Sequence, residues 1–203
     1  MHLPLKIRGI PIIPLDPTEP PGMVVMRALS LLGTPQLIIL TGLALALALV
    51  WGRRWKEILL LILTVSGGEL INVLLKWLFA QPRPSWSHPL LVFSTSSFPS
   101  GHAMRSVLFF GLLGYLLRSE MGSWRGRVWT MASGGLVLLI GVSRLYLGAH
   151  ELIDVLVGYA VGGGWLACAI TGVETVQRYR RDDEAPEATV DEGRGGRKTC
   201  FLR

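Results

Sequence analysis

Two histidines stand beside polar, turn-forming residues in a chain that is otherwise strongly apolar. His102 follows Ser100 and Gly101 in the stretch FPSGH, and His150 lies four residues before Asp154 in the stretch HELID. Residues four apart share one face of a helix, so the Asp154 carboxylate can accept a hydrogen bond from one nitrogen of the His150 ring. That contact leaves the other ring nitrogen basic, so the pair suits nucleophilic catalysis, although it also fits a satisfied structural pair.

Three cations accompany the histidines along the chain. Lys76 ends an apolar segment, Arg83 lies between two prolines, and Arg144 lies near the end of another apolar segment. Each has a plain interpretation when taken alone, since lysines reach to the membrane interface and loop arginines are common. The helix start at Ser100–Gly101 adds N–H groups that attract anions. Together these features predict a site for an oxyanion with several negative charges, and phosphate is the leading candidate.

Five apolar runs supply the elements that would position these residues. They cover residues 37–51, 57–75, 106–117, 128–147 and 152–171, and we extend the first back to near Arg27 and the third back to near Gly101 so that each can span. Each is close to the ~20 residues that a helix needs to cross a bilayer core about 30 Å thick. Backbone groups in lipid must satisfy their own hydrogen bonds. We therefore predict an all-α fold, a polytopic transmembrane helix bundle with about five spanning helices.

Basic residues alternate with the apolar runs in a way that orients the bundle. Arg53 and Arg54 follow the first run, Arg118 and Arg125 follow the third, and Arg178 follows the fifth. An excess of Arg and Lys marks cytoplasmic loops, so these sites indicate the cytoplasmic face and a cytoplasmic C-terminus. The two histidines and their neighbours then lie on the extracytoplasmic side of the cell membrane. The net charge of +6 is mostly a topology signal, and no nucleic-acid surface is expected.

Composition divides the chain into three parts. Residues 1–26 hold six prolines and are predicted to form an extended or surface-lying arm; an alternative is that 3–25 re-enters the membrane surface. Residues 27–175 form the transmembrane domain, and 176–203 are a polar tail of disordered composition.

Glycines are frequent within the apolar runs. They occur as pairs at 67–68 and 134–135, and four residues apart at 158 and 162. Small residues let membrane helices approach closely. We therefore expect helix contacts at all three places.

The polar stretches resemble the signature motifs of a known family, the type 2 phosphatidic acid phosphatase superfamily. The three motifs are Lys76 followed after six residues by Arg83-Pro84, then Pro99-Ser100-Gly101-His102, then Ser143-Arg144 followed after five residues by His150 and after three more by Asp154. The resemblance extends from Lys76 to Asp154. Membrane members of that family usually carry six spans, with the lysine motif ending the third, whereas here it ends the second.

The resemblance implies a role for each motif residue. His150 would be the nucleophile that forms a phosphohistidine, Asp154 would orient it, and His102 would protonate the leaving oxygen and then activate water. Five residues would bind the phosphoryl oxygens, namely Lys76, Arg83, Ser100, Gly101 and Arg144. Neither a metal nor another cofactor is implied, because cations and amides take that place. A homodimer is left open.

The expected function is therefore hydrolysis of a membrane lipid phosphate or diphosphate, of the polyprenyl diphosphate, phosphatidic acid or phosphatidylglycerol phosphate type. Two other functions use the same anion site. A non-catalytic protein that binds or transports lipid phosphates needs the cations but no acid–base pair, so it leaves the two histidines unexplained. Vanadate-dependent haloperoxidases resemble the same site, but they are soluble, and the five apolar runs argue against that class.

Overall fold

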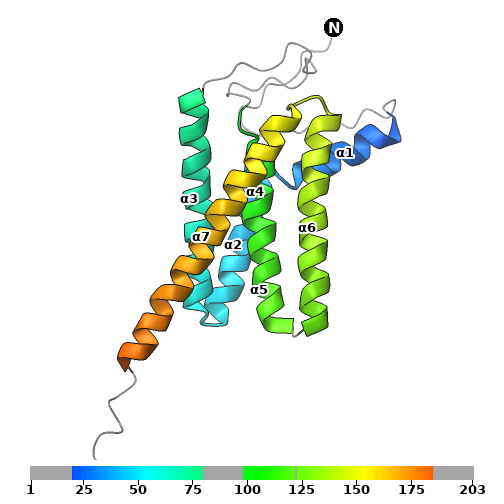
Figure 1. Ribbon diagram of the computed structural model, residues 1–203. Coiled ribbons are helices and arrows are strands. Elements are labelled where there is room, and N and C mark those ends of the chain that lie inside the picture. Colours follow the sequence, from blue (N-terminus) through cyan, green and yellow to red (C-terminus); the bar gives the residue numbers. More distant parts are fainter. Residues whose placement is uncertain (1–19, 80–97, 122, 185–203) are drawn as a thin grey trace, which may run out of the picture.

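The computed structural model of the protein describes residues 20–79, 98–121 and 123–184. Throughout these ranges the regular structure is helical and contains no strand (Figure 1). The elements are α1 (Pro21–Leu31), α2 (Pro35–Trp51), α3 (Trp55–Phe79), α4 (Gly101–Ser106), the π-helical segment η1 (Val107–Gly111), α5 (Leu112–Met121), α6 (Ser123–Tyr146) and α7 (Leu152–Glu184). The all-α prediction is confirmed for this part of the chain.

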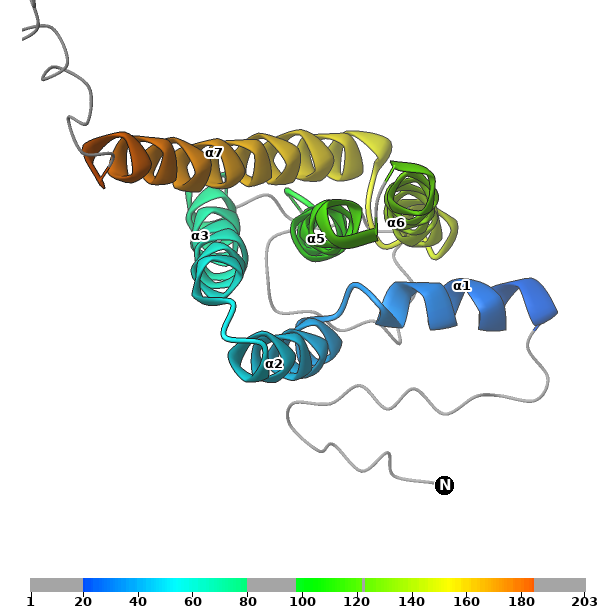
Figure 2. The same cartoon turned by 90° about the horizontal axis from the view of Figure 1, so that it is seen from below.

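The continuous helical stretch made by α4, η1 and α5 forms the centre of the bundle. Figure 2 shows α5 enclosed by α2, α3, α6 and α7. Met104 and Leu112 are fully buried, and Leu108 and Phe109 are nearly so. The stretch contacts α3, α6 and α7, which agrees with its central position.

The number of membrane spans differs from the predicted five. Within the described chain, α3, α7 and residues 124–146 of α6 are long and apolar enough to cross a membrane, and α1 with α2 adds a fourth if the bent pair is one span. The third predicted run is divided among α4, η1 and α5, and it carries His102 and Arg105. The described structure therefore supports three to four spans, not clearly five.

The first predicted run is interrupted by a bend of 51° between α1 and α2. Thr34 is extended, its hydroxyl accepts a hydrogen bond from the N–H of Leu37, and Pro35 opens α2. A residue before proline is disfavoured in the helical conformation, and proline itself lacks an N–H, so Thr34-Pro35 ends one helix and begins another. Residues 21–26, placed in the predicted extended arm, belong to α1; residues 1–19 lie outside the described part.

Two of the predicted basic loops lie at the same end of the bundle. An Arg54 guanidinium nitrogen lies 2.9 Å from a Glu57 carboxylate oxygen and 2.7 Å from a Glu120 oxygen. These ion pairs join the connection between α2 and α3 to the end of α5, and α7 ends in the same direction (Figure 1). The basic segments that follow every second apolar run therefore lie at one end of the bundle, because successive helices run in opposite directions.

The glycine predictions hold at two of the three places. A Cβ at Gly68 would lie 2.2 Å from Leu108, and a Cβ at Gly158 would lie 2.8 Å from the Ser100 carbonyl oxygen. Both positions therefore need glycine for close approach. The prediction is wrong for Gly134 and Gly135, where a Cβ would meet no described atom within 4 Å.

We expect Gly126→Ala to lower the melting temperature of the detergent-solubilised protein. A Cβ there would lie 2.9 Å from the Arg118 Cα and 3.0 Å from its carbonyl oxygen, so α5 and α6 would have to separate. Overpacking of this kind costs about 1–3 kcal/mol. Gly134→Ala, on the same helix in open space, is the matched control and should not lower the melting temperature. Equal losses for both variants would contradict the packing argument.

Candidate active site

The turn between α6 and α7 sets the spacing of Arg144 and His150. Gly148 has a φ of 62°, a left-handed conformation that glycine adopts readily. Its N–H donates to the Leu145 carbonyl at 3.0 Å, and the N–H of Ala149 donates to the Arg144 carbonyl at 3.1 Å. These are the two bonds of a Schellman helix end. The turn thus satisfies carbonyls at the end of α6 and brings the Arg144 backbone next to the residue that precedes His150.

The predicted contact between His150 and Asp154 is present. His150 Nδ1 lies 3.3 Å from Asp154 Oδ2, which also accepts the backbone N–H of Glu151 at 3.2 Å. The two side chains are almost completely buried, with 3% and 5% of their areas exposed. Asp154 is in the first turn of α7, where the helix dipole favours a carboxylate. The geometry directs Nδ1 of the ring to Asp154, and Nε2 therefore lies on the opposite edge.

The stretch that contains His102 is docked directly on this first turn of α7. The backbone N–H of Ser100 donates to the Asp154 carbonyl at 3.0 Å. The Ser100 hydroxyl caps α4 by accepting the N–H of Ala103 at 3.5 Å. Gly158, one turn further along α7, leaves room for the Ser100 carbonyl. A hydrogen bond between backbone groups therefore joins the second motif, at Ser100, to the third motif, at Asp154.

Gly101 has neighbours that its sequence context did not reveal. The family resemblance implies that Gly101 binds a phosphoryl oxygen. In the structure, a Cβ at this position would lie 2.9 Å from Arg105 Nη1 and 3.0 Å from Asn72 Nδ2. Asn72 is 1% exposed, and neither polar atom of its amide has a hydrogen-bond partner among the described residues. The space beside Gly101 is thus occupied by two polar side chains of the protein.

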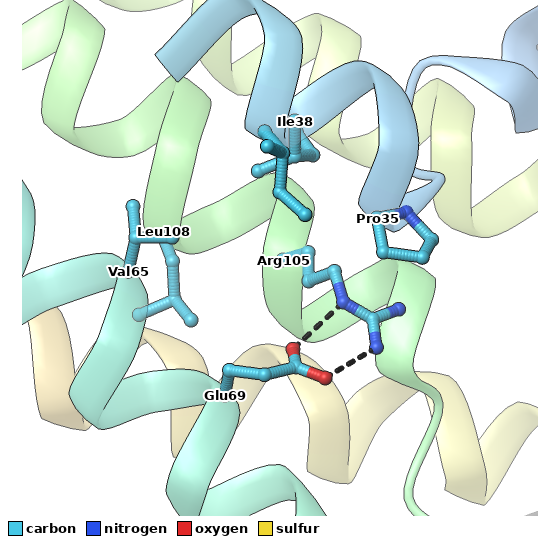
Figure 3. Close-up of a pocket in the computed structure, with 7 residues that line it drawn as sticks. Pro35, Ile38, Val65, Glu69, Arg105 and Leu108 are labelled. Carbon is cyan, nitrogen blue, oxygen red and sulfur yellow. Dashed lines mark hydrogen bonds and ion pairs between the residues drawn. The ribbon is translucent and has the colours of Figure 1, made fainter. Parts of the chain in front are cut away.

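Arg105 forms a two-point ion pair with Glu69 across the α3–α4 contact. Nε donates at 2.8 Å and Nη2 at 2.7 Å to the two carboxylate oxygens (Figure 3). The pair borders a cavity of about 150 Å³ whose other walls are apolar side chains of α2, α3 and η1 together with Pro35. Among the described residues, no predicted site residue lines this cavity. The residues that line this cavity are mostly apolar, and they are different residues from those around His102 and His150.

The corner between α1 and α2 also contacts the site. Nη1 of Arg144 donates to Oγ of Ser30 at 2.6 Å, and both residues are buried. A Cβ at Gly33 would lie 3.2 Å from both Cβ and Cδ2 of His102. Part of the N-terminal segment is therefore packed against two of the motif residues.

The structure brings most of the predicted site residues to one end of the bundle. His150, Asp154, Ser100 and Arg144 are linked by the contacts given above, and Gly101 and His102 directly follow Ser100. This end contains the end of α3, the start of α4, the end of α6 and the start of α7 (Figure 1). Lys76 lies half-buried near the end of α3. Arg83 lies outside the described residues.

Sequence reasoning missed Ser30, Gly33, Glu69, Asn72 and Arg105. Three of them had a detectable signal. Glu69, Asn72 and Lys76 are spaced to share one face of α3, and Arg105 is an ionisable residue within a predicted span, which marks a functional or paired position. Ser30 and Gly33 carry no local pattern that points to the site.

We expect Gly148→Ala to destabilise the protein although a Cβ would meet no described atom within 4 Å at this position. The cause is backbone strain, because a left-handed φ costs an ordinary residue roughly 1–2 kcal/mol. Gly148→Asn should cost less, since asparagine tolerates this conformation. Thermal unfolding of the two variants in detergent measures the difference. Equal stability of Gly148→Ala and the unchanged protein would show that the turn does not require glycine.

Comparison with known proteins places this arrangement in context. Phosphatidylglycerophosphatase B of Bacillus subtilis is 29% identical over 140 residues, which are 68% of this chain and 68% of the relative. Undecaprenyl-diphosphatase of Sulfolobus acidocaldarius is 25% identical over 150 residues, covering 70% of this chain and 68% of the relative.

Two solved structures share the fold. The transmembrane PAP2 type phosphatidylglycerolphosphate phosphatase from Bacillus subtilis matches with a TM-score of 0.68 and 24% identity, over 84% of this chain and 82% of that chain. Aquifex aeolicus LpxE matches with a TM-score of 0.60 and 24% identity, over 75% of this chain and 87% of that chain. The family model for the PAP2 superfamily matches residues 57–178, more than half of the chain and all three motifs. The resemblance seen in the motifs is thereby confirmed, and the chain belongs to the PAP2 superfamily.

Proposed function

We propose that the protein is an integral, multi-pass membrane phosphatase that hydrolyses a lipid phosphate or diphosphate on the extracytoplasmic side of the cell membrane. The observation that carries the proposal is the buried His150–Asp154 pair, joined through Ser100 to the stretch that holds His102. A protein that only binds a lipid phosphate needs cations, whereas a paired histidine and a second histidine suit group transfer. The basic loops at the opposite end support a cytoplasmic C-terminus.

The first chemical step transfers the phosphoryl group to His150. A bond forms between its Nε2 and phosphorus while the bond from phosphorus to the leaving oxygen breaks. Asp154 holds the proton on Nδ1 and stabilises the positive charge that the ring acquires. His102 gives its proton to the leaving oxygen, so the lipid product departs as a neutral alcohol or as a lipid monophosphate.

The second step releases inorganic phosphate. His102, now neutral, takes a proton from a water molecule whose oxygen attacks phosphorus, and the bond between phosphorus and His150 breaks. Both histidines thereby return to their starting protonation states. This reuse of one residue as acid and then base requires a pKa near the working pH, which is ordinary for histidine.

Cations and amides would stabilise the transferring group in both steps. Arg144 is 3% exposed and Lys76 is half-buried, so their charges act in surroundings that screen them weakly. Together with Arg83 and the amides around Ser100 and Gly101, they can bind the oxygens among which the transition-state charge is spread. We propose that this set replaces a metal ion.

The substrate is proposed to be a lipid because the site lies at one end of a bundle of apolar helices. The two curated relatives are named for a phosphatidylglycerol phosphate and for an undecaprenyl diphosphate. Both molecules carry a terminal phosphate on a membrane-anchored chain. A terminal lipid phosphate is therefore the class of substrate that the membrane position and the relatives jointly favour.

We expect His150→Ala to reduce phosphate release from short-chain phosphatidic acid or a short-chain polyprenyl diphosphate by at least ~10³-fold, because the nucleophile is removed. The melting temperature should stay close to that of the unchanged protein. Glu151→Ala, which removes an exposed neighbouring side chain, is the matched control and should keep its activity. Full activity of His150→Ala would refute the proposed nucleophile, and halide oxidation on addition of vanadate would favour the haloperoxidase alternative.

We also expect activity to persist in the presence of EDTA, because the proposed mechanism uses only side chains and backbone amides. The measurement is phosphate release after dialysis against the chelator, compared with release after readdition of Mg²⁺. Loss of activity that magnesium restores would overturn the metal-independent mechanism while leaving the phosphatase assignment intact.

A further inference from the structure

The geometry points to the corner between α1 and α2, residues 30–33, as a wall of the phosphate site: Ser30 positions the guanidinium of Arg144, and Gly33 seats His102. This inference rests on the proposed phosphatase function, since it assigns the corner a task within that site. The family model begins its match at residue 57, so the corner lies outside the matched region. Ser30 acts through Arg144 and is a positioning residue.

The contact between Ser30 and Arg144 joins residues that are 114 positions apart in the sequence. Nη1 donates to the Ser30 hydroxyl oxygen at 2.6 Å, and the residues are 3% and 6% exposed for Arg144 and Ser30, respectively. A guanidinium is a planar fork with five N–H donors, so a bond at one terminal nitrogen constrains the direction of the others. Ser30 therefore sets the plane in which Arg144 meets a bound oxyanion.

Helix α1 packs against the C-terminal end of α6, and this packing keeps Ser30 in place. The 51° bend turns α1 away from the direction of α2, and α1 packs on α6 (Figure 2). At the other end of α1, a Cβ on Gly22 would lie 3.3 Å from the Tyr146 hydroxyl. Contacts near both ends of α1 thus involve the last turn of α6, which also carries Arg144.

Gly33 fits between His102 and α6. A side chain there would have its Cβ 3.0 Å from Cγ2 of Ile140 and 3.2 Å from Cβ and Cδ2 of His102. Ile140 is completely buried and lies one turn before Arg144, so it has little room to move. With Ile140 fixed, a side chain at this position would have to displace His102 by a few tenths of an ångström. The same corner therefore contacts the proposed acid and supports the proposed oxyanion cation.

The first test compares Ser30→Ala with Ser30→Thr in the detergent phosphatase assay. A misplacement of about 1 Å at a reacting group can cost ~10²-fold. We expect Ser30→Ala to lower kcat/KM about tenfold or more and to weaken inhibition by orthovanadate, a phosphate mimic, by a similar factor. Ser30→Thr keeps the hydroxyl and should restore both values. Ser119→Ala is the matched control, because its hydroxyl bonds only the nearby Leu116 carbonyl among described groups, at the opposite end of the bundle.

A double-mutant cycle with Arg144 separates positioning from a general effect on folding. If Ser30 acts through Arg144, Ser30→Ala should have little further effect on kcat/KM in the Arg144→Ala background. The same loss in both backgrounds would overturn the inference. If Ser30→Ala does not fold, Ser30→Cys takes its place, because a thiol of similar size is only a weak acceptor.

The second test compares Gly33→Ala with Gly135→Ala. The first should lower kcat by displacing His102, whereas the second adds a methyl group in open space and should leave turnover unchanged. If the protein without substitutions releases no phosphate from any lipid phosphate, the proposed function is refuted. If it is active and the Ser30→Ala and Gly33→Ala variants are equally active, only the role of the corner is refuted.

Discussion

The backbone hydrogen bond from Ser100 to Asp154 is the contact on which the arrangement of the site depends. It fixes the turn that starts the central helix against the first turn of α7, and Gly158 makes the approach short enough. The bond thereby joins the stretch that carries His102 directly to the turn that follows His150. Because both partners are backbone groups, the bond constrains chain positions and leaves the side chains available for chemistry.

Around this contact, three ionisable groups have hydrogen-bonding partners within the protein. A buried charge without a partner is very unfavourable in an apolar environment. Asp154 accepts from the Glu151 N–H and contacts His150, Arg144 donates to Ser30, and Arg105 meets Glu69 at two points. Each pair joins different elements or neighbouring turns. The polar end of the bundle is therefore also where its helices are locked in register.

The parts of the site that follow from local geometry could be predicted from the sequence. The spacing of His150 and Asp154 places them on one helical face in any α-helix, so their contact was predictable. The bend before Pro35 also had a local signal, namely the proline itself. The prediction missed it because one proline hardly changes the average hydropathy of a long apolar run. The Ser30–Arg144 contact depends on how α1 packs across α6, and no sequence spacing encodes that. Gly101 and Gly134 show the same limit, since a glycine's neighbours are decided by tertiary packing.

The π-helical segment Val107–Gly111 has a consequence for how the central helix serves two ends of the molecule. A π turn holds one more residue than an α turn, and each residue of an α-helix advances about 100° around the axis. The segment therefore offsets the angular phase of α5 from that of α4. The angle between the His102 side chain and the face that α5 presents to α6 therefore differs from the angle that an unbroken α-helix would give. One uninterrupted helical stretch can thus direct His102 at one end and pack the side chains of α5 against α6 at the other.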